Sequence, residues 1–300
     1  MNANEGRWFY RRGELARDGW ESVVVGRAPQ WQHTGIRIGV LGEGESLALD
    51  TTGVERIVVP LAGSFTVLSE EGGVATSTDL AGRASVFDGP TDSLYLSSAA
   101  TGVVTGRGRF AVAESPTAER KPTRHLAADS VPVELRGAGA ASREVRNFGV
   151  PAVLDAARLI VCEVVTPADN WSSYPPHKHD EHVAGAESRL EEIYYFESAS
   201  TDGAHDDTAF GVFSAYSSPA GEIDINARVH SGDIALIPFG YHGPAIAAPG
   251  YDLYYLNVMA GPDPDREWLI SDDPAHAWLR EAWPHQPVDP RLPFNKKGQR

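Results

Sequence analysis

Short runs of β-branched, aromatic and other apolar residues recur along almost the whole chain, separated by Gly, Pro, Asp and Ser. Runs bounded by turn residues in this way predict strands. The predicted strands cover residues 22–25, 36–41, 57–61, 64–68, 93–96, 159–165, 193–196, 211–216, 234–237 and 254–259. Long amphipathic helical patterns are nearly absent, and the two helices that we expect, at 274–281 and 118–126, are short. The sequence therefore predicts an all-β sandwich or barrel.

Linker-like segments rich in Pro, Gly, Ala and Ser, at 115–122 and 137–142, divide the chain near its middle. Each side of this division shows a similar order of strands and glycine-bounded turns. This order indicates a duplicated β-domain, with an N-terminal domain at 1–125 and a C-terminal domain at 126–300 that includes a tail. Only the second domain carries the histidines described below.

Composition excludes several classes of function. The net charge of −15 argues against a nucleic-acid partner, because phosphate binding favours a basic face. The single cysteine, Cys162, rules out an intramolecular disulfide and is typical of a reducing cytosol. The N-terminal residues form no apolar signal segment, and no apolar stretch is long enough to span a bilayer. We therefore expect a cytoplasmic protein without a nucleic-acid or membrane partner.

Two segments about fifty residues apart suggest one metal site. His177 and His179 flank one residue, so on a strand both imidazoles share a face. Glu191 and Glu192 follow on the next strand, and only one of them can face the same way. His242 comes after a Pro-x-Gly turn. Three imidazoles and one carboxylate suit Zn, Mn, Fe or Ni and can leave positions open for a substrate.

These elements resemble the two sequence motifs of the cupin superfamily, although the stretch between the second histidine and the glutamate is longer and the last histidine comes one residue earlier. Longer motifs resemble the 5-deoxy-glucuronate isomerase family of myo-inositol catabolism. They are residues 142–147, 171–180, 190–195, 240–242, 248–261 and 272–278. That resemblance implies a bicupin of two jelly-roll β-barrels with few short helices, a metal-free first barrel and a metal-bearing second one. Likeness to the related uronate ketol-isomerases makes Glu192, not Glu191, the metal ligand.

The resemblance implies conversion of 5-deoxy-D-glucuronate to 2-deoxy-5-keto-D-gluconate, an aldose–ketose isomerisation through an enediolate that one divalent metal, most simply Zn, stabilises. The acidic substrate calls for cationic side chains. Candidate substrate-binding residues are Arg143, Arg146, Tyr174 and Lys178, and candidate catalytic residues are Tyr241, Tyr255 and Glu191. Lys178 alternates with the ligands, so a structural role facing away from the metal is its main alternative. Asp180, Asp233 and Asn257 are candidates to hold the second nitrogen of each histidine ligand.

Two other functions compete with this hypothesis. A metal-dependent cupin dioxygenase would use the same ligands for Fe(II), and metal content and oxygen uptake would distinguish it. A non-catalytic sugar-binding bicupin is the second, and the intact ligand set beside Tyr and Arg argues against it. The Trp-rich tail around 278–283 could cover a barrel or contact a second copy of the chain, so a homo-oligomer stays open.

Overall fold

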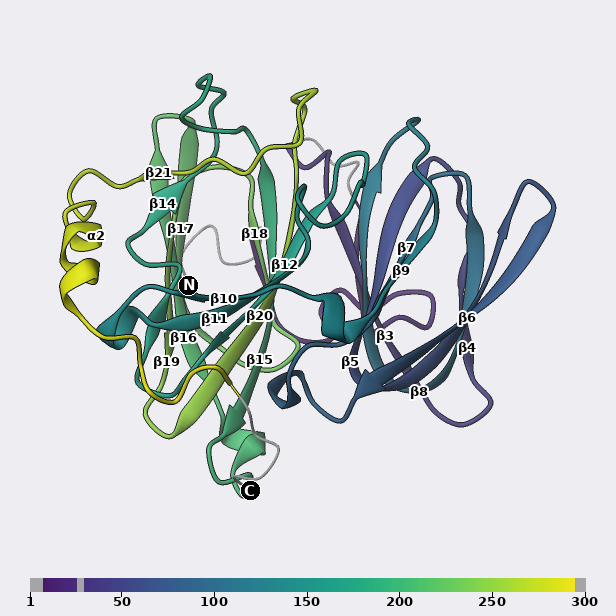
Figure 1. Cartoon of the computed structure of the whole chain (residues 1–300), viewed down its shortest axis with the longest axis horizontal. Coiled ribbons are helices and arrows are strands. Elements are labelled where there is room, and N and C mark those ends of the chain that lie inside the picture. Colours follow the sequence, from purple (N-terminus) through teal and green to yellow (C-terminus); the bar gives the residue numbers. More distant parts are fainter. Residues whose placement is uncertain (1–7, 26–29, 295–300) are drawn as a thin grey trace.

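The computed structural model describes residues 8–25 and 30–294, which form two lobes of antiparallel strands (Figure 1). The strands of the first half are β1 (Phe9–Tyr10), β2 (Ser22–Val24), β3 (Gly35–Leu41), β4 (Ser46–Leu49), β5 (Val54–Glu71), β6 (Val74–Arg83), β7 (Ser93–Leu96), β8 (Thr101–Pro116) and β9 (Arg124–Leu126). Those of the second half are β10 (Val133–Arg136), β11 (Arg143–Gly149), β12 (Ile160–Thr166), β13 (Trp171–Ser172), β14 (His177–Lys178), β15 (Glu191–Ser200), β16 (Gly211–Ser218), β17 (Gly221–Val229), β18 (Ile234–Ile237), β19 (Tyr241–Ala247), β20 (Tyr251–Ala260) and β21 (Ser271–Asp272). The predicted all-β class is confirmed.

The first lobe is one eight-stranded sheet in the order β2-β3-β8-β5-β7-β9, with β4 paired to β8 and β6 to β5. The long strands β5 and β8 run antiparallel over their whole lengths, with a bulge between Pro60 and Ala62. Successive side chains of β5 point to opposite faces. Val58 packs in the core of this lobe, whereas Ile57 and Val59 pack in the core shared with the second lobe. The alternation therefore lets one strand serve two cores.

The second lobe holds two sheets. One has seven strands in the order β1-β18-β15-β20-β12-β11-β10, and the other has six, with β17-β16-β19-β14-β21 in line and β13 on β19. Strand β1 pairs with β18, so residues 9–10 join a sheet of the second half of the chain. The domain boundary near residue 125 stays a prediction. The candidate site lies between the two sheets of this lobe.

The helical predictions fail in part. No helix forms at 118–126, because residues 124–126 pair with β7 and Pro122 cannot donate to a helical hydrogen bond. The region 274–281 begins as turns, and the helix α2 (Leu279–Ala282) starts later and continues as a 3-10 turn at Trp283–His285. Further 3-10 turns lie at Val86–Asp88, Ala128–Ser130, Gly139–Ala141 and Asp206–Thr208. Within the described residues, no helix is both long and apolar enough to cross a membrane.

A buried carboxylate ties the two lobes together. Glu55 of β5 is fully buried and accepts hydrogen bonds from Tyr95 Oη at 2.6 Å and from the backbone N–H groups of Ala157, Arg158 and Leu159 at 2.6–2.8 Å. We expect Glu55→Ala to lower the free energy of unfolding by about 3–5 kcal/mol, because several buried donors lose their acceptor. Glu55→Gln keeps the shape and part of the acceptor capacity, so its loss should be smaller. Urea titration at constant m-value measures both. Equal stability of Glu55→Ala and wild type would contradict this role.

Candidate functional site

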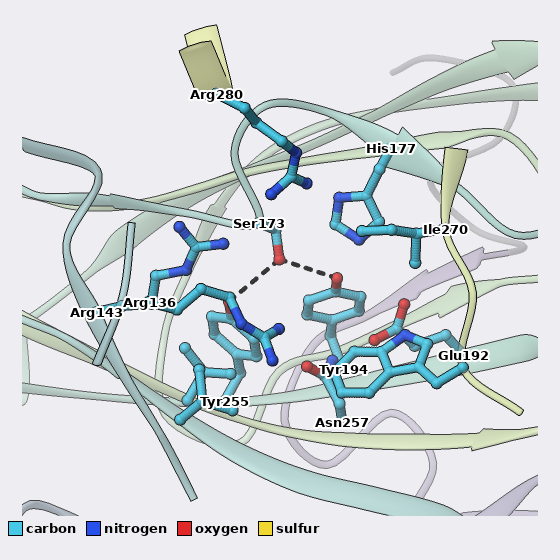
Figure 2. A pocket seen from close by; sticks show the side chains of 13 residues that line it. Arg136, Arg143, Ser173, His177, Glu192, Tyr194, Tyr255, Asn257, Ile270 and Arg280 are labelled. Carbon is cyan, nitrogen blue, oxygen red and sulfur yellow. Dashed lines mark hydrogen bonds between the residues drawn. The ribbon is translucent and has the colours of Figure 1, made fainter. Parts of the chain in front are cut away.

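A cavity of about 210 Å³ opens between the two sheets of the second lobe (Figure 2). Strands β10, β11, β12, β15 and β20 form one wall, β14 and the loop before it form the opposite wall, and the segment leading into α2 covers the rest. The lining residues are Arg136, Arg143, Val145, Val164, Ser173, His177, Glu192, Tyr194, Tyr255, Asn257, Trp268, Ile270 and Arg280.

The four predicted metal ligands meet beside this cavity. His177 of β14 is the register partner of His242 on β19, and their ring centroids lie 4.6 Å apart. The ligand atoms of His179, Glu192 and His242 lie within 4.8 Å of one another. His177 stands just outside that tight group. All four side chains are buried, so the sequence prediction that distant segments converge is matched by the fold.

Each of the three imidazoles is held through Nδ1 by a backbone carbonyl. His177 Nδ1 lies 3.3 Å from the oxygen of Pro175, His179 Nδ1 lies 3.1 Å from that of Leu190, and His242 Nδ1 lies 3.2 Å from that of Gly240. A carbonyl can only accept, so each Nδ1 carries a proton, and Nε2 is the ring nitrogen that each histidine turns toward the ligand group. This orientation leaves Nε2 of each histidine available to a metal.

The expected partners of these nitrogens were wrong, because backbone carbonyls take that role. Asp180 accepts from Lys178 and from the backbone N–H of Gly240 instead. Asp233 accepts from Arg11 Nη1. Asn257 lines the cavity itself.

The donor set fits a divalent metal. His242 Nε2 is buried without a hydrogen-bond partner, although Glu192 Oε2 lies 3.0 Å away. Burial alone would raise the pKa of Glu192, but the imidazoles of His179 and His242 outweigh it and lower this pKa to about 2. Burial and the neighbouring imidazoles hold the pKa of His177 well below its ordinary value. Burial lowers the pKa of His179, but the hydrogen bond and charge of Glu192 outweigh it and raise this pKa. A metal binds the anionic carboxylate and neutral imidazoles, so its binding would release any proton held between Glu192 and His179.

Three guanidinium groups, those of Arg136, Arg143 and Arg280, line the same cavity as His177 and Glu192, and in Figure 2 Arg136 and Arg143 enter from the side opposite the two ligands. Arg136 is paired with Glu134, at 2.8 Å, and Arg280 is paired with Asp272. Arg143 is only 5% exposed, donates to the carbonyl of Ala141, and has no carboxylate partner among the described residues.

Arg143 is therefore a buried positive charge that forms no ion pair with any carboxylate in the described part of the chain. Burial, helped by the charges of Arg136 and Arg280, lowers its pKa to about 10, so it stays cationic at neutral pH. Its guanidinium lies 5.4 Å from the ring centroid of Trp283, which Arg280 also contacts at 5.0 Å. A buried, unpaired guanidinium is costly without an anion and is suited to bind a carboxylate.

Arg146 and Glu191, two other candidates, face away from the cavity. Arg146 follows Arg143 on β11 with odd spacing, so it points to the other face, where it donates to Glu144 and to the carbonyls of Val86 and Gly89. The two oxygens of Glu191 accept from the backbone N–H groups of residues 32–34. The substrate-binding role expected for Arg146 and the catalytic role expected for Glu191 were wrong, because both side chains hydrogen-bond to backbone groups of the first half of the chain instead of facing the cavity.

Lys178, Tyr241 and Tyr174 also lie outside the cavity. The ammonium of Lys178 is bound by Asp180 and Glu187 at 2.7–2.8 Å, which is the structural alternative foreseen for it. Tyr241 precedes His242 and so faces the other side of β19, where it stacks on Tyr216 at 5.5 Å. Tyr174 packs edge-on against Trp171. The predicted substrate-binding roles of Lys178 and Tyr174 and the predicted catalytic role of Tyr241 were therefore wrong, because none of the three side chains lines the cavity.

Tyr255 is the predicted catalytic candidate that the structure places in the cavity. Sequence reasoning missed other lining residues, chiefly Arg136, Ser173, Tyr194 and Arg280. Tyr194 could have been predicted from the sequence, because it lies two residues after Glu192 on β15 and so faces the same side of the sheet. Arg280 carried no signal, because it reaches the cavity from a segment almost forty residues beyond the last ligand.

Comparison with known proteins gives the same picture along most of the chain. The sequence model of the KduI/IolB family matches residues 9–279. A 5-deoxy-glucuronate isomerase of Geobacillus thermodenitrificans is 36% identical over 273 residues, covering 87% of this chain and 93% of the relative. That of Bacillus subtilis strain 168 is 36% identical over 244 residues, covering 80% and 85%.

Solved structures agree. An IolB-like protein of Salmonella typhimurium LT2 superposes with a TM-score of 0.81 at 31% identity, covering 91% of this chain and 99% of that one. An oxalate decarboxylase of Lactobacillus farciminis superposes with a TM-score of 0.61 at 11% identity, covering 89% and 88%, which is a likeness of fold alone. The predicted bicupin fold class and the resemblance noted in the sequence are both confirmed.

Proposed function

The chain belongs to the KduI/IolB family, and from this premise we propose that it is a 5-deoxy-glucuronate isomerase. It converts 5-deoxy-D-glucuronate to 2-deoxy-5-keto-D-gluconate, an exchange of an aldehyde and its neighbouring hydroxyl for a hydroxyl and a ketone. The reaction is intramolecular and needs no oxidant. The substrate is a small acidic sugar whose carboxylate lies at the end opposite the aldehyde.

The observation that carries this proposal is the polarity of the cavity. Two of the metal-ligand residues, His177 and Glu192, lie on one side, and the guanidinium of Arg143, which has no carboxylate partner among the described residues, lies on the other (Figure 2). A substrate with a reacting aldehyde at one end and a carboxylate at the other complements both sides. Val145 and Val164, register partners on β11 and β12, line the wall near Arg143. They offer an apolar surface to the deoxy carbon beside the carboxylate.

His177, His179, Glu192 and His242 would hold one divalent ion, for which Zn is the simplest candidate and Mn, Fe and Ni are alternatives. When bound, such an ion supplies Lewis acidity to oxygens beside it. The chain itself supplies the rest. Arg143 binds and orients the carboxylate, and Trp268 and Ile270 help to exclude water from the reacting end. The group that moves the carbon-bound proton is not assigned to a residue.

Elemental analysis of the purified protein, paired with NMR observation of the substrate aldehyde, tests the function. We expect about one divalent ion per chain and disappearance of the aldehyde signal with growth of the ketose. A chelator should stop turnover, and adding the metal back should restore it.

D-Glucuronate should react more slowly, because its extra hydroxyl would meet Val145 and Val164 without a hydrogen-bond partner. Oxygen uptake with a catechol or thiol, and no loss of aldehyde, would instead establish the dioxygenase alternative.

We also propose that the protein works in the cytoplasm. Its single thiol, Cys162, is buried and free, and burial raises the pKa of this thiol, so it is unreactive and forms no disulfide. Assembly into a homo-oligomer stays a prediction, which the mass in solution would test.

A further inference from the structure

We infer that the hydroxyl groups of Ser173, Tyr194 and Tyr255 form a relay that carries the oxygen-bound proton between the two reacting oxygens of the sugar. This inference rests on the proposed isomerase function and adds three residues to it. None of the three is a metal ligand. All three line the cavity, and Figure 2 shows the hydroxyl of Ser173 between those of the two tyrosines.

Ser173 bridges the two phenols. Its Oγ lies 3.0 Å from Tyr194 Oη and 3.1 Å from Tyr255 Oη, and in each contact either oxygen can be the donor. The two phenol rings pack 5.1 Å apart, and all three side chains are buried. The serine hydroxyl has one proton, so it donates to one phenol and accepts from the other. The three hydroxyls thus form a directed chain with two states.

The ends of this chain differ in what they offer to a ligand. The phenol that accepts from Ser173 keeps its own proton and donates it into the cavity, whereas the phenol that donates to Ser173 can only accept there. Reversing the chain exchanges the two ends. Ser172 also lies beside Tyr255, but its hydroxyl already donates to the carbonyl of Ala245 at 3.1 Å and accepts from Thr166 at 2.7 Å. Ser173 is therefore the hydroxyl that is free to reverse.

An aldose–ketose isomerisation requires this exchange. In the aldose, the C1 oxygen is a carbonyl acceptor and the C2 oxygen is a hydroxyl donor, and in the ketose these roles are reversed. One proton moves from C2 to C1 through a separate base. The second proton moves between the oxygens, and the relay carries it. The O–H bond at the C2 oxygen breaks, each relay hydroxyl receives one proton and releases one, and an O–H bond forms at the C1 oxygen. The relay stays neutral and ends in its reversed state, complementary to the product.

The backbone is built to hold Ser173 in this position. Its φ of 45° lies in the left-handed region, which is unusual for a residue other than glycine and is strained. Gly243 makes the approach feasible, because a Cβ atom there would lie 1.8 Å from the carbonyl oxygen of Ser173. A serine kept in a strained conformation, with its hydroxyl between two phenols, is consistent with a function for that hydroxyl.

Ser173→Gly is the sharpest test, since glycine adopts the left-handed backbone without strain and removes only the hydroxymethyl group. We expect kcat for 5-deoxy-glucuronate to fall about 100-fold, with KM and metal content nearly unchanged. In mixtures of H₂O and D₂O, the rate of the wild type should curve with deuterium fraction, because several protons move together. The variant should give a straight line. A merely structural serine would not change this dependence.

Tyr255→Phe and the double variant Ser173→Gly/Tyr255→Phe complete the experiment. Members of one relay act as a unit, so the double variant should lose little more than either single variant. Tyr241→Phe is the matched control, because this phenol also neighbours a ligand in sequence but lies outside the cavity, and it should retain wild-type kcat. Wild-type kcat and curvature in Ser173→Gly, or additive losses in the double variant, would overturn the relay while leaving the isomerase function intact. Absence of turnover by the wild type would refute the isomerase function first, and the relay with it.

Discussion

Replacing His242 by Ala should remove the metal and lower turnover of 5-deoxy-glucuronate by roughly 10⁴-fold or more, since metal stabilisation contributes several kcal/mol to such reactions. Nε2 of this residue is buried, lacks a hydrogen-bond partner and lies 3.0 Å from Glu192. The other ring nitrogen contacts the carbonyl of Gly240, which orients the imidazole with Nε2 toward the ligand group. Folding should survive, because the variant relieves a crowded cluster of imidazoles. Elemental analysis, the NMR assay and thermal unfolding together measure the effect.

His182→Ala is the matched control for this experiment. His182 lies in the same ligand-rich segment but is exposed and paired with Asp263 at 2.9 Å. It should keep both metal and turnover. A His177→Ala/His242→Ala double variant that contained no metal and still turned over at the wild-type rate would refute a catalytic metal.

Replacing Arg143 by Met should lower kcat/KM for 5-deoxy-glucuronate by roughly 10³-fold, mainly through KM, because loss of a buried charge pair with the carboxylate costs about 2–5 kcal/mol. The same change should leave the free protein as stable as wild type or more so, since it removes a buried charge that has no carboxylate partner among the described residues. Loss of activity together with a gain in stability is typical of a residue kept for binding rather than for folding. Steady-state kinetics and urea titration of the ligand-free protein measure the two effects.

Arg146→Met provides the contrasting control from the opposite face of the same strand. Arg146 is fully buried against Glu144, at 2.8 Å, and near Glu163, at 3.6 Å. Removing it leaves the buried carboxylates of Glu144 and Glu163 without this cationic partner, so the free energy of unfolding should fall by about 3–5 kcal/mol. If Arg143→Met left KM unchanged, the carboxylate would have to bind Arg136 or Arg280, and the role assigned to Arg143 would be wrong.

The local sequence pattern predicted most of the strands but not every element of secondary structure. Turn residues at short intervals identified the β-rich runs, and the all-β class followed from them. The helix predicted at 118–126 failed because residues 124–126 find a partner in β7, a pairing made by chain some thirty residues away. Such long-range pairing overrides a weak local preference.

In the candidate site, too, some features follow from the local sequence and others only from tertiary packing. Alternation on a strand is local, so sequence alone determined that Glu191 and Glu192, and His177 and Lys178, lie on opposite faces. The same alternation turns Tyr241 away from His242, and the choice of Tyr241 as a catalytic candidate did not take it into account. Sequence alone could not determine for Arg143 and Arg146, or for the two glutamates without the family resemblance, which member faces the substrate. That choice depends on which face of the seven-stranded sheet meets the six-stranded sheet and which meets the first lobe. Arg280 and Ser173 enter the cavity from separate segments, and only tertiary packing brings their side chains to it.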